Sequence, residues 1–351
     1  MRAVRYHGPG DIRLDQQPDP QCGPNDVVIA PAAVGICGTD LHIAAGEFPL
    51  ARPPVTLGHE FAGRIVAVGG GGGDLSAGDL SAGDLSVGDL VTVEPHRYCG
   101  RCAYCRLGQE HLCDAKRGYG VRLDGGMADL VVVPAAKAFP VPTGVSTTLA
   151  ALTEPAACCL HGIDRLQPKP GLPVIVFGCG PAGLLLVRLA ALSGLSPVVA
   201  VDGMPARRAT AARVGADVLL DAHSPTLADD ARRCTGGAGF PFVIDAVGAS
   251  AVLSQGIRLA SRGARILLFG VAPQHDALSI SPYDVYIREL TLLGSCINPF
   301  THSRAVGLLP ALGVEHWNVA SFDLADHAAA FDAHRNQEAD KVLITPTPAQ
   351  P

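Results

Sequence analysis

The chain has 351 residues, of which 48% are apolar and 17% are charged, and its formal net charge is −6. This length is sufficient for two domains, and the composition excludes a disordered chain, so we expect a soluble globular protein. Because the lysines and arginines are scattered and the net charge is negative, nucleic acids and anionic membranes are excluded as partners.

The start of the chain and its cysteines indicate the compartment. Residues 1–6 lack the apolar stretch of a signal peptide, and the apolar segment 184–195 is short and contains Arg188. We therefore expect a cytoplasmic protein. The eleven cysteines cannot all pair within the chain, and in a reducing compartment clustered cysteines are typical of metal binding.

Residues 1 to about 150 are predicted to form a barrel-like all-β domain. Short runs of β-forming residues alternate there with turns rich in glycine and proline. The clearest predicted strands span 26–30, 63–68 and 129–133. A five-residue repeat at 74–88 has a period that suits neither helix nor strand, so we interpret it as a surface loop lengthened by duplication.

From about residue 170 onward, strands and helices alternate. The apolar run 173–177 predicts a buried strand, and the segment 184–192 after it has apolar residues at helical spacing. Further strands are predicted at 198–201, 218–220, 242–244 and 265–269, with helices at 205–214, 226–233 and 249–261. This alternation is typical of a parallel, doubly wound sheet.

Four cysteines within fifteen positions form the strongest motif. Their spacing is Cys-x2-Cys-x2-Cys-x7-Cys, and they are Cys99, Cys102, Cys105 and Cys113. Four thiolates this close can surround one tetrahedral ion, whereas iron–sulfur clusters usually show a different spacing and a trailing proline. We therefore predict a structural zinc site, whose four protein ligands leave no position open for chemistry.

A second group of ligand-type side chains lies upstream of these cysteines, at Cys37, His59 and Glu60. Alone, a cysteine or histidine is more often part of a core than a ligand. Together, a thiolate, an imidazole and a carboxylate supply three zinc ligands and leave a fourth position open, as a catalytic zinc requires. Glu154, at the junction of the two predicted domains, offers another carboxylate to the same ion.

A glycine motif directly follows the strand predicted at 173–177. Its three glycines are Gly178, Gly180 and Gly183, and Pro181 and Ala182 open the predicted helix. The backbone N–H groups of such a turn can bind a pyrophosphate, and a lone motif of this kind is weak evidence without a strand before it and a helix after it. Both are predicted here, so we assign these residues to a dinucleotide site.

Asp202 lies nineteen residues after the last glycine of this motif, at the end of the next predicted strand. A carboxylate there accepts hydrogen bonds from both hydroxyls of the adenine ribose and repels a 2′-phosphate, which favours NAD over NADP. Arg207, which we assign to the same cofactor site, and Arg208 lie close enough to temper this preference.

In this order, the motifs resemble those of the zinc-containing medium-chain dehydrogenase/reductase family, in particular its sorbitol-, polyol- and threonine-dehydrogenase-like branch, over nearly the whole chain. The resemblance implies a two-domain α/β fold. A GroES-like β-barrel catalytic domain would comprise residues 1–150 and 295–351, and a Rossmann domain with the parallel sheet would comprise 151–294, with the active site in the cleft. We expect a homodimer or homotetramer.

The resemblance also implies roles for single residues. Cys37 and His59 match catalytic zinc ligands of the family, and the four clustered cysteines match its structural zinc lobe. Thr39 matches the hydroxyl residue that contacts the substrate oxygen, and His42 matches the imidazole at the far end of its proton relay. Glu154 stands where enzymes for simple alcohols have a second cysteine, and whether Glu60 or Glu154 binds the zinc directly stays open.

The activity that the resemblance implies is a zinc-dependent, NAD-linked dehydrogenase. Its small-molecule substrate would be a polar secondary alcohol or the matching ketone: a polyol, cyclitol, sugar alcohol or amino alcohol. The alternatives are a dehydrogenase for simple primary alcohols or aldehydes, a zinc-free reductase, and a non-catalytic protein that binds zinc and a dinucleotide. The presence of both ligand sets and of the residues matching the relay argues against the last two.

Overall fold

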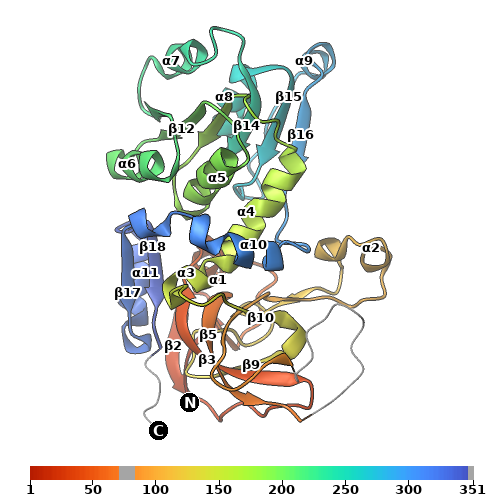
Figure 1. Cartoon of the computed structure of the whole chain (residues 1–351), viewed down its shortest axis with the longest axis vertical. Helices are drawn as coiled ribbons and strands as arrows, with labels where there is room; N and C mark the ends of the chain where they lie inside the picture. Colours follow the sequence, from red (N-terminus) through yellow and green to blue (C-terminus); the bar gives the residue numbers. More distant parts are fainter. Residues whose placement is uncertain (71–83, 347–351) are drawn as a thin grey trace. The chain divides into compact units, whose positions relative to one another are not determined.

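The structure, a computed structural model, describes residues 1–70 and 84–346 (Figure 1). The chain divides into two compact units. The first unit combines Met1–Glu154, His302–Pro310 and the segment that begins at Asn318, and the second combines Pro155–Thr301 with Ala311–Trp317. The chain therefore leaves the first unit, builds the second, and returns.

A seven-stranded sheet dominates the described part of the first unit. Six of its strands follow the order β10-β6-β5-β3-β18-β17, and β9 also pairs with β3. Their bounds are Asp26–Gly35 (β3), Glu60–Val68 (β5), Leu90–Val93 (β6), Val131–Pro134 (β9), Ala138–Pro140 (β10), Val319–Phe322 (β17) and Lys341–Ile344 (β18). All pairs are antiparallel except β17 with β18.

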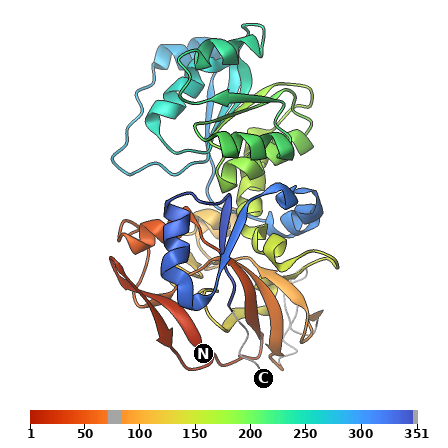
Figure 2. The same ribbon diagram turned by 90° about the vertical axis from the view of Figure 1, so that its left-hand side faces the viewer.

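Smaller sheets and short helices complete the described part of this unit. The order β2-β1-β4 joins Asp11–Gln16, Arg2–Gly8 and Val55–Thr56, and β7 (His96–Arg97) pairs with β8 (Arg117–Gly118). The α-helices are Gly38–Ala44 (α1), Ala103–Arg106 (α2), Thr147–Ala151 (α3), His302–Leu308 (α10) and His327–Arg335 (α11). Helix α11 packs on β17 and β18 (Figure 2).

The core of the first unit lies between these strands. Branched and aromatic residues dominate it, because strands with one buried face place every second side chain inward. Its largest fully buried members are Ile29, Ile36, Ile43, Leu57, Phe61, Ile65 and Met127. The all-β character predicted for residues 1–150 is confirmed, with short helices between the strands.

The second unit holds a parallel sheet in the order β13-β12-β11-β14-β15-β16. The strands are Val174–Phe177 (β11), Val198–Asp202 (β12), Val218–Asp221 (β13), Phe240–Asp245 (β14), Ala260–Leu268 (β15) and Thr291–Gly294 (β16). The helices are Pro181–Leu192 (α5), Pro205–Val214 (α6), Leu227–Arg233 (α7), Ser250–Leu259 (α8) and Pro282–Arg288 (α9), and α4 (Thr153–Leu166) enters this unit. The strand order reverses between β11 and β14, which is where open α/β sheets bind ligands.

The alternation predicted after residue 170 is confirmed in type and order. The first helix begins at Pro181, as the glycine motif predicted and three residues before the apolar run 184–192, because Gly180 caps it and Pro181 opens it. The sequence patterns did not predict α4, α9, α10 or α11, nor β16, β17 and β18. Most of the 74–88 repeat lies outside the described residues. Within the described ranges, no helix is long and apolar enough to cross a membrane.

Candidate metal and cofactor sites

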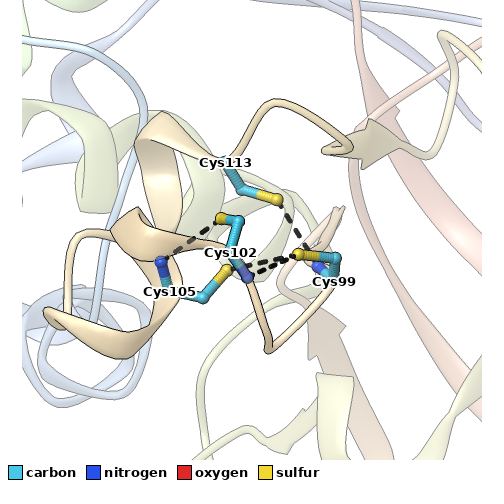
Figure 3. Close-up of side chains that lie close together, drawn as sticks. All are labelled: Cys99, Cys102, Cys105 and Cys113. Atoms are coloured by element: carbon cyan, nitrogen blue, oxygen red, sulfur yellow. Dashed lines mark hydrogen bonds between the residues drawn. The ribbon is translucent and has the colours of Figure 1, made fainter.

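The four clustered cysteines lie in one segment between β7 and β8, and their sulfur atoms point toward a common centre (Figure 3). All four sulfur atoms lie within 4.8 Å of one another, and Cys99 Sγ is 3.9 Å from Cys105 Sγ. In a tetrahedral site with metal–sulfur distances of about 2.3 Å, sulfur atoms are roughly 3.8 Å apart. The donor set and its spacing therefore fit one zinc ion.

Backbone N–H groups of the same segment point at these sulfur atoms. Cys99 Sγ accepts from the N–H groups of Cys102, at 3.3 Å, and Arg101, at 3.5 Å. These two donors lower the pKa of the Cys99 thiol to about 6, whereas desolvation and the Cys102 sulfur raise that of Cys105 to about 12. The pKa values of these two thiols are thus shifted in opposite directions, and a bound cation would stabilise the thiolate form of both.

The second ligand set is assembled from separate elements of the first unit. Cys37 follows β3, His59 precedes β5, and Glu60 is the first residue of β5. One ligand atom of each lies within 4.8 Å of the others. Gly35 pairs with Glu60 across β3 and β5, and this register brings the three side chains together.

Asp40, which the sequence analysis missed, supports this cluster. Its side chain is fully buried, its Oδ2 accepts from the Cys37 N–H at 2.9 Å, and its Oδ1 lies 3.6 Å from His59 Nδ1. Burial lowers the pKa of His59, but the charges of Asp40 and Cys37 outweigh it and raise the pKa well above the usual range. A carboxylate behind a ligating imidazole fixes its tautomer and orientation.

Lys341, on β18, was also missed. It forms an ion pair with Glu60 Oε2, and both side chains are almost fully buried. No local pattern pointed to this lysine, because it is 281 positions from Glu60 along the chain. The spacing of Cys37 and Asp40 on one helical turn, in contrast, was visible in the sequence.

The remaining residues of the first unit that we assigned to catalysis lie as follows. Thr39 and His42 are three positions apart on α1, Thr39 partly buried and His42 exposed. Glu47 Oε2 lies 2.8 Å from His42 Nδ1. Glu154 is buried at the start of α4. Among the described residues, the ligand atoms of Cys37, His59 and Glu60 lie within 4.8 Å of one another, and Glu154 is not part of this group.

The glycine motif forms a tight turn between β11 and α5. Gly178 has a φ of +90°, which an L side chain rarely adopts. A Cβ on Gly180 would meet no atom closer than Arg207 Nη1, at 3.9 Å, and a Cβ on Gly183 would overlap the Gly178 carbonyl. These are the three glycine requirements of a dinucleotide loop: a tight turn, an open approach for the pyrophosphate, and close packing of helix on strand.

Asp202 ends β12 beside this loop. Its Oδ2 accepts from the Cys179 N–H at 2.7 Å and its Oδ1 from the Met204 N–H at 2.8 Å. Each carboxylate oxygen keeps a further lone pair for a ligand hydroxyl. Arg208 donates to the Asp202 carbonyl and approaches Asp221, so it is occupied within the unit, whereas Arg207 Nη1 lies beside Gly180 of the loop.

Comparison with known proteins gives two family matches. Residues 23–143 match the alcohol dehydrogenase GroES-like domain, and residues 181–310 match the zinc-binding dehydrogenase family. A sorbitol dehydrogenase of Halalkalibacterium halodurans is 31% identical over 344 residues, which cover 97% of this chain and 97% of that protein.

Solved structures give the same architecture. A zinc-binding dehydrogenase of Sinorhizobium meliloti, bound to NADP, is 36% identical with a TM-score of 0.89, covering 98% of this chain and 99% of that chain. A short chain alcohol dehydrogenase of Escherichia coli CFT073, in complex with NADH, is 28% identical with a TM-score of 0.87 and the same two coverages. The two-domain α/β fold expected from the sequence is thereby confirmed.

Proposed function

The chain belongs to the zinc-binding medium-chain alcohol dehydrogenases, and on that premise we propose that it transfers hydride between NAD and a polar secondary alcohol or the matching ketone. The observation that carries this proposal is the three-ligand cluster of Cys37, His59 and Glu60. Three protein ligands leave a position for a substrate oxygen, which a purely structural metal site does not need. The second unit supplies the dinucleotide loop that a hydride transfer requires.

We assign one zinc ion to each ligand set of the first unit. The four cysteines would hold a structural ion, and Cys37, His59 and Glu60 would hold a catalytic one. A zinc ion held by Cys37, His59 and Glu60 would act as a Lewis acid and lower the pKa of a bound alcohol. Elemental analysis of the metal-saturated protein should give two zinc ions per chain, and a value of one would contradict this assignment.

The residues of α1 would carry the proton released when the alcohol is oxidised. Thr39 begins the path with a hydroxyl two positions after Cys37. His42 lies three positions further along, on the same face of the helix, and is exposed to solvent. The proton would reach solvent through His42 while the hydride passes to the nicotinamide, so each oxidation yields one NADH and one proton.

Glu154 is proposed to act on the same ion as Glu60. A buried carboxylate at the start of α4 supports this proposal, and the metal cluster of the described residues contains Glu60 but not Glu154. We therefore propose Glu60 as the direct ligand and Glu154 as a carboxylate that exchanges with it or binds the substrate oxygen.

The cofactor preference rests on Asp202 and is not transferred from relatives, since one similar structure contains NADP and another NADH. Both oxygens of this carboxylate are fixed by backbone N–H groups, so the charge lies where the adenine ribose would approach. We expect a higher kcat/KM with NAD than with NADP. Asp202→Ala should narrow this preference about tenfold or more, because ribose hydrogen bonds and repulsion of a 2′-phosphate are both lost.

A matched control for this experiment is Asp229→Ala, which removes an exposed carboxylate that pairs with Arg232 within α7 of the same unit. This change should leave the ratio of the two kcat/KM values unaltered. Equal efficiency with NAD and NADP in the unmodified enzyme would exclude the proposed preference.

The substrate class would be decided by a panel of polyols, cyclitols, sugar alcohols, amino alcohols and simple primary alcohols, followed by reduction of NAD. We expect the polar secondary alcohols to be oxidised faster than simple primary alcohols. Cys37→Ser serves as the negative control. Activity that survives in this variant would mean that the cluster is not catalytic.

The assignment of domains, compartment and assembly is also part of the proposal. We assign residues 1–150 and 295–351 to the catalytic domain and 151–294 to the cofactor domain. All eleven cysteines are free, which supports a reducing cytoplasm.

We further propose a homodimer or homotetramer. Strand β16 is at one edge of the parallel sheet, and α9, which packs on β15, exposes Tyr283 and Tyr286. A strand edge beside exposed aromatic side chains favours pairing with another copy. Light scattering after size exclusion would measure the mass of the assembly.

A further inference from the structure

A carboxylate lies beside His42, the imidazole at which the proposed proton path reaches solvent. Glu47 Oε2 is 2.8 Å from His42 Nδ1, which is a normal hydrogen-bond length. Both side chains are more than half exposed, 52% for His42 and 64% for Glu47, so burial does not force them together. Exposed charged pairs on flexible side chains are often loose, and this contact therefore depends on what fixes the backbone of the two residues.

The end of α1 turns the chain so that Glu47 returns to His42. The N–H of Glu47 donates to the His42 carbonyl at 2.8 Å, and the N–H of Gly46 donates to the Ile43 carbonyl at 2.9 Å. Gly46 has a φ of +76°. These two bonds and the left-handed glycine form a Schellman motif, by which a helix satisfies its last carbonyl groups. Main-chain bonds thus fix the position of Glu47 relative to His42.

The turn between β1 and β2 holds this helix end in place. The N–H of Gly10 donates to the Ala44 carbonyl at 2.8 Å. A Cβ on Gly46 would lie 2.5 Å from Pro9 Cγ, so a side chain at residue 46 would collide with this turn. The glycine is therefore required twice, for its φ and for this close approach. The helix end that carries the imidazole and the carboxylate is thus anchored to β1 and β2.

The contact decides which nitrogen of His42 carries the proton when the ring is neutral. An ionised carboxylate can only accept hydrogen bonds, so Nδ1, which faces Glu47, must be the N–H donor. The lone pair of the neutral ring is then on Nε2. In the other tautomer Nε2 would already carry a proton and could not accept one. The carboxylate therefore selects the tautomer whose Nε2 can act as a base.

From this geometry we infer that Glu47 is a positioning residue for the proton path: it keeps Nδ1 of His42 protonated, so that Nε2 can accept the proton released by the alcohol. The inference rests on the proposed function, because it needs an oxidation that releases a proton. When Nε2 takes up the proton, the ring becomes an imidazolium whose charge the carboxylate stabilises. Loss of that proton from Nε2 to water restores the neutral ring, while the hydride goes to NAD.

Glu47→Gln tests this role in turnover. An amide keeps the shape of the side chain but can donate as well as accept, so it no longer selects one tautomer. We expect kcat for alcohol oxidation to fall about fivefold, the size typical of an exposed charged pair, with an unchanged KM for NAD. Asp332→Asn is the matched control, because it removes an exposed carboxylate paired with Arg335 on α11 of the same unit. An equal kcat in Glu47→Gln and in this control would overturn the inference.

Nuclear magnetic resonance of the imidazole nitrogens gives a readout that does not depend on turnover. In protein with isotope-labelled histidine, at about pH 8 where an ordinary histidine is neutral, the signals missing in His42→Gln belong to His42. We expect Nδ1 to carry the proton in the unmodified protein and in Asp332→Asn, and a mixture of tautomers in Glu47→Gln. The same tautomer population in Glu47→Gln and in the unmodified protein would contradict the inference.

A double variant tests whether Glu47 acts through His42. His42→Gln removes the imidazole, so adding Glu47→Gln to it should lower kcat no further. A further decrease would mean that the carboxylate acts independently of the imidazole, and the inference would fail. If the unmodified protein shows the expected tautomer but oxidises no alcohol of the panel, the proposed function is wrong, and with it the role of Glu47.

Discussion

The two metal-ligand clusters of the first unit differ in how the chain builds them. Cys99, Cys102, Cys105 and Cys113 come from one segment of fifteen residues, and N–H groups of that segment supply hydrogen bonds to the sulfur atoms. The other cluster combines the end of β3, the start of β5 and, through Glu60, the distant strand β18. A local cluster can be recognised from spacing alone, whereas an assembled one depends on pairing between strands.

The sharpest contrast should appear when one cysteine of each cluster is replaced. Cys37→Ser should reduce turnover more than the roughly 100-fold loss typical of a residue behind a ligand, with the melting temperature nearly kept. Cys102→Ser should instead destabilise the unit, on the order of 3 kcal/mol, because a structural zinc contributes folding energy directly. Paired kinetic and thermal measurements on both variants would test this contrast. The opposite ranking would exchange the roles of the two clusters.

We expect the next largest effect from Asp40, whose carboxylate lies next to His59. Asp40→Asn removes a buried charge that contacts His59 and the backbone of Cys37. We expect zinc affinity of the assembled cluster to fall about 10–100-fold, with no change in the four-cysteine lobe. Asp129→Asn, which breaks an ion pair with Arg2 in the same unit, is the matched control. Equal zinc loss from both variants would show a general loss of stability instead.

The two carboxylates assigned to the assembled cluster should give smaller effects. Glu154→Gln and Glu60→Gln should each lower kcat by about tenfold while leaving NAD affinity unchanged, because each removes a negative charge assigned to the metal. The double variant should be non-additive if both residues act on one ion. An unaffected Glu154→Gln enzyme with full zinc would leave Glu154 as a packing residue at the start of α4.

The last effect appears only at acidic pH, and it concerns a buried group outside both clusters. His302 is 2% exposed, packs on Phe139 at 4.8 Å, and has no hydrogen-bond partner for either ring nitrogen among the described residues. Desolvation lowers its pKa to about 3, so the folded protein keeps the ring neutral. The unfolded chain, in contrast, binds a proton as the pH falls below about 6.5.

This difference destabilises the folded state progressively from about pH 6.5 down to pH 3. At pH 5 the neutral His302 lowers the free energy of unfolding by roughly 2 kcal/mol, since that pH is about 1.5 units below the pKa of a histidine in the unfolded chain. His302→Phe should abolish this loss. Denaturant unfolding at pH 8 and pH 5 would measure the free energy of unfolding of both proteins. Protonation of the metal ligands at pH 5 should destabilise both proteins equally. If the pH dependence is the same in the variant, the ring is already paired or protonated in the folded protein.

The sequence predicted the parts of this molecule that are encoded locally. Apolar runs such as Val174–Phe177 and the glycines at 178, 180 and 183 gave the parallel sheet and its loop, because each pattern is complete within a few residues. The four cysteines gave the lobe for the same reason. The strand β18 was not predicted, although it is as long as β11, and no local pattern indicates its pairing with the distant strand β3.

The residues around the assembled cluster that were not predicted are those whose positions depend on burial or on pairing between distant strands. The sequence could have indicated Asp40, because it follows Cys37 by one helical turn, but it could not show that the Asp40 side chain is buried. Lys341 was beyond reach, because only the pairing of β18 with β3 brings it to Glu60. Glu154 was proposed from its place at the domain junction, and the geometry of the described residues separates it from the three ligands grouped around Cys37.

The return of the chain to its first unit has a consequence for biosynthesis. A ribosome has supplied every ligand of the four-cysteine lobe once residue 113 has emerged, whereas Glu60 receives its buried counter-ion only after Lys341 has been added and the whole parallel-sheet unit has been made. Domains generally fold as units during synthesis. A nascent chain can therefore complete its structural lobe early, while the cluster assigned to catalysis gains its last supporting residue more than two hundred residues later.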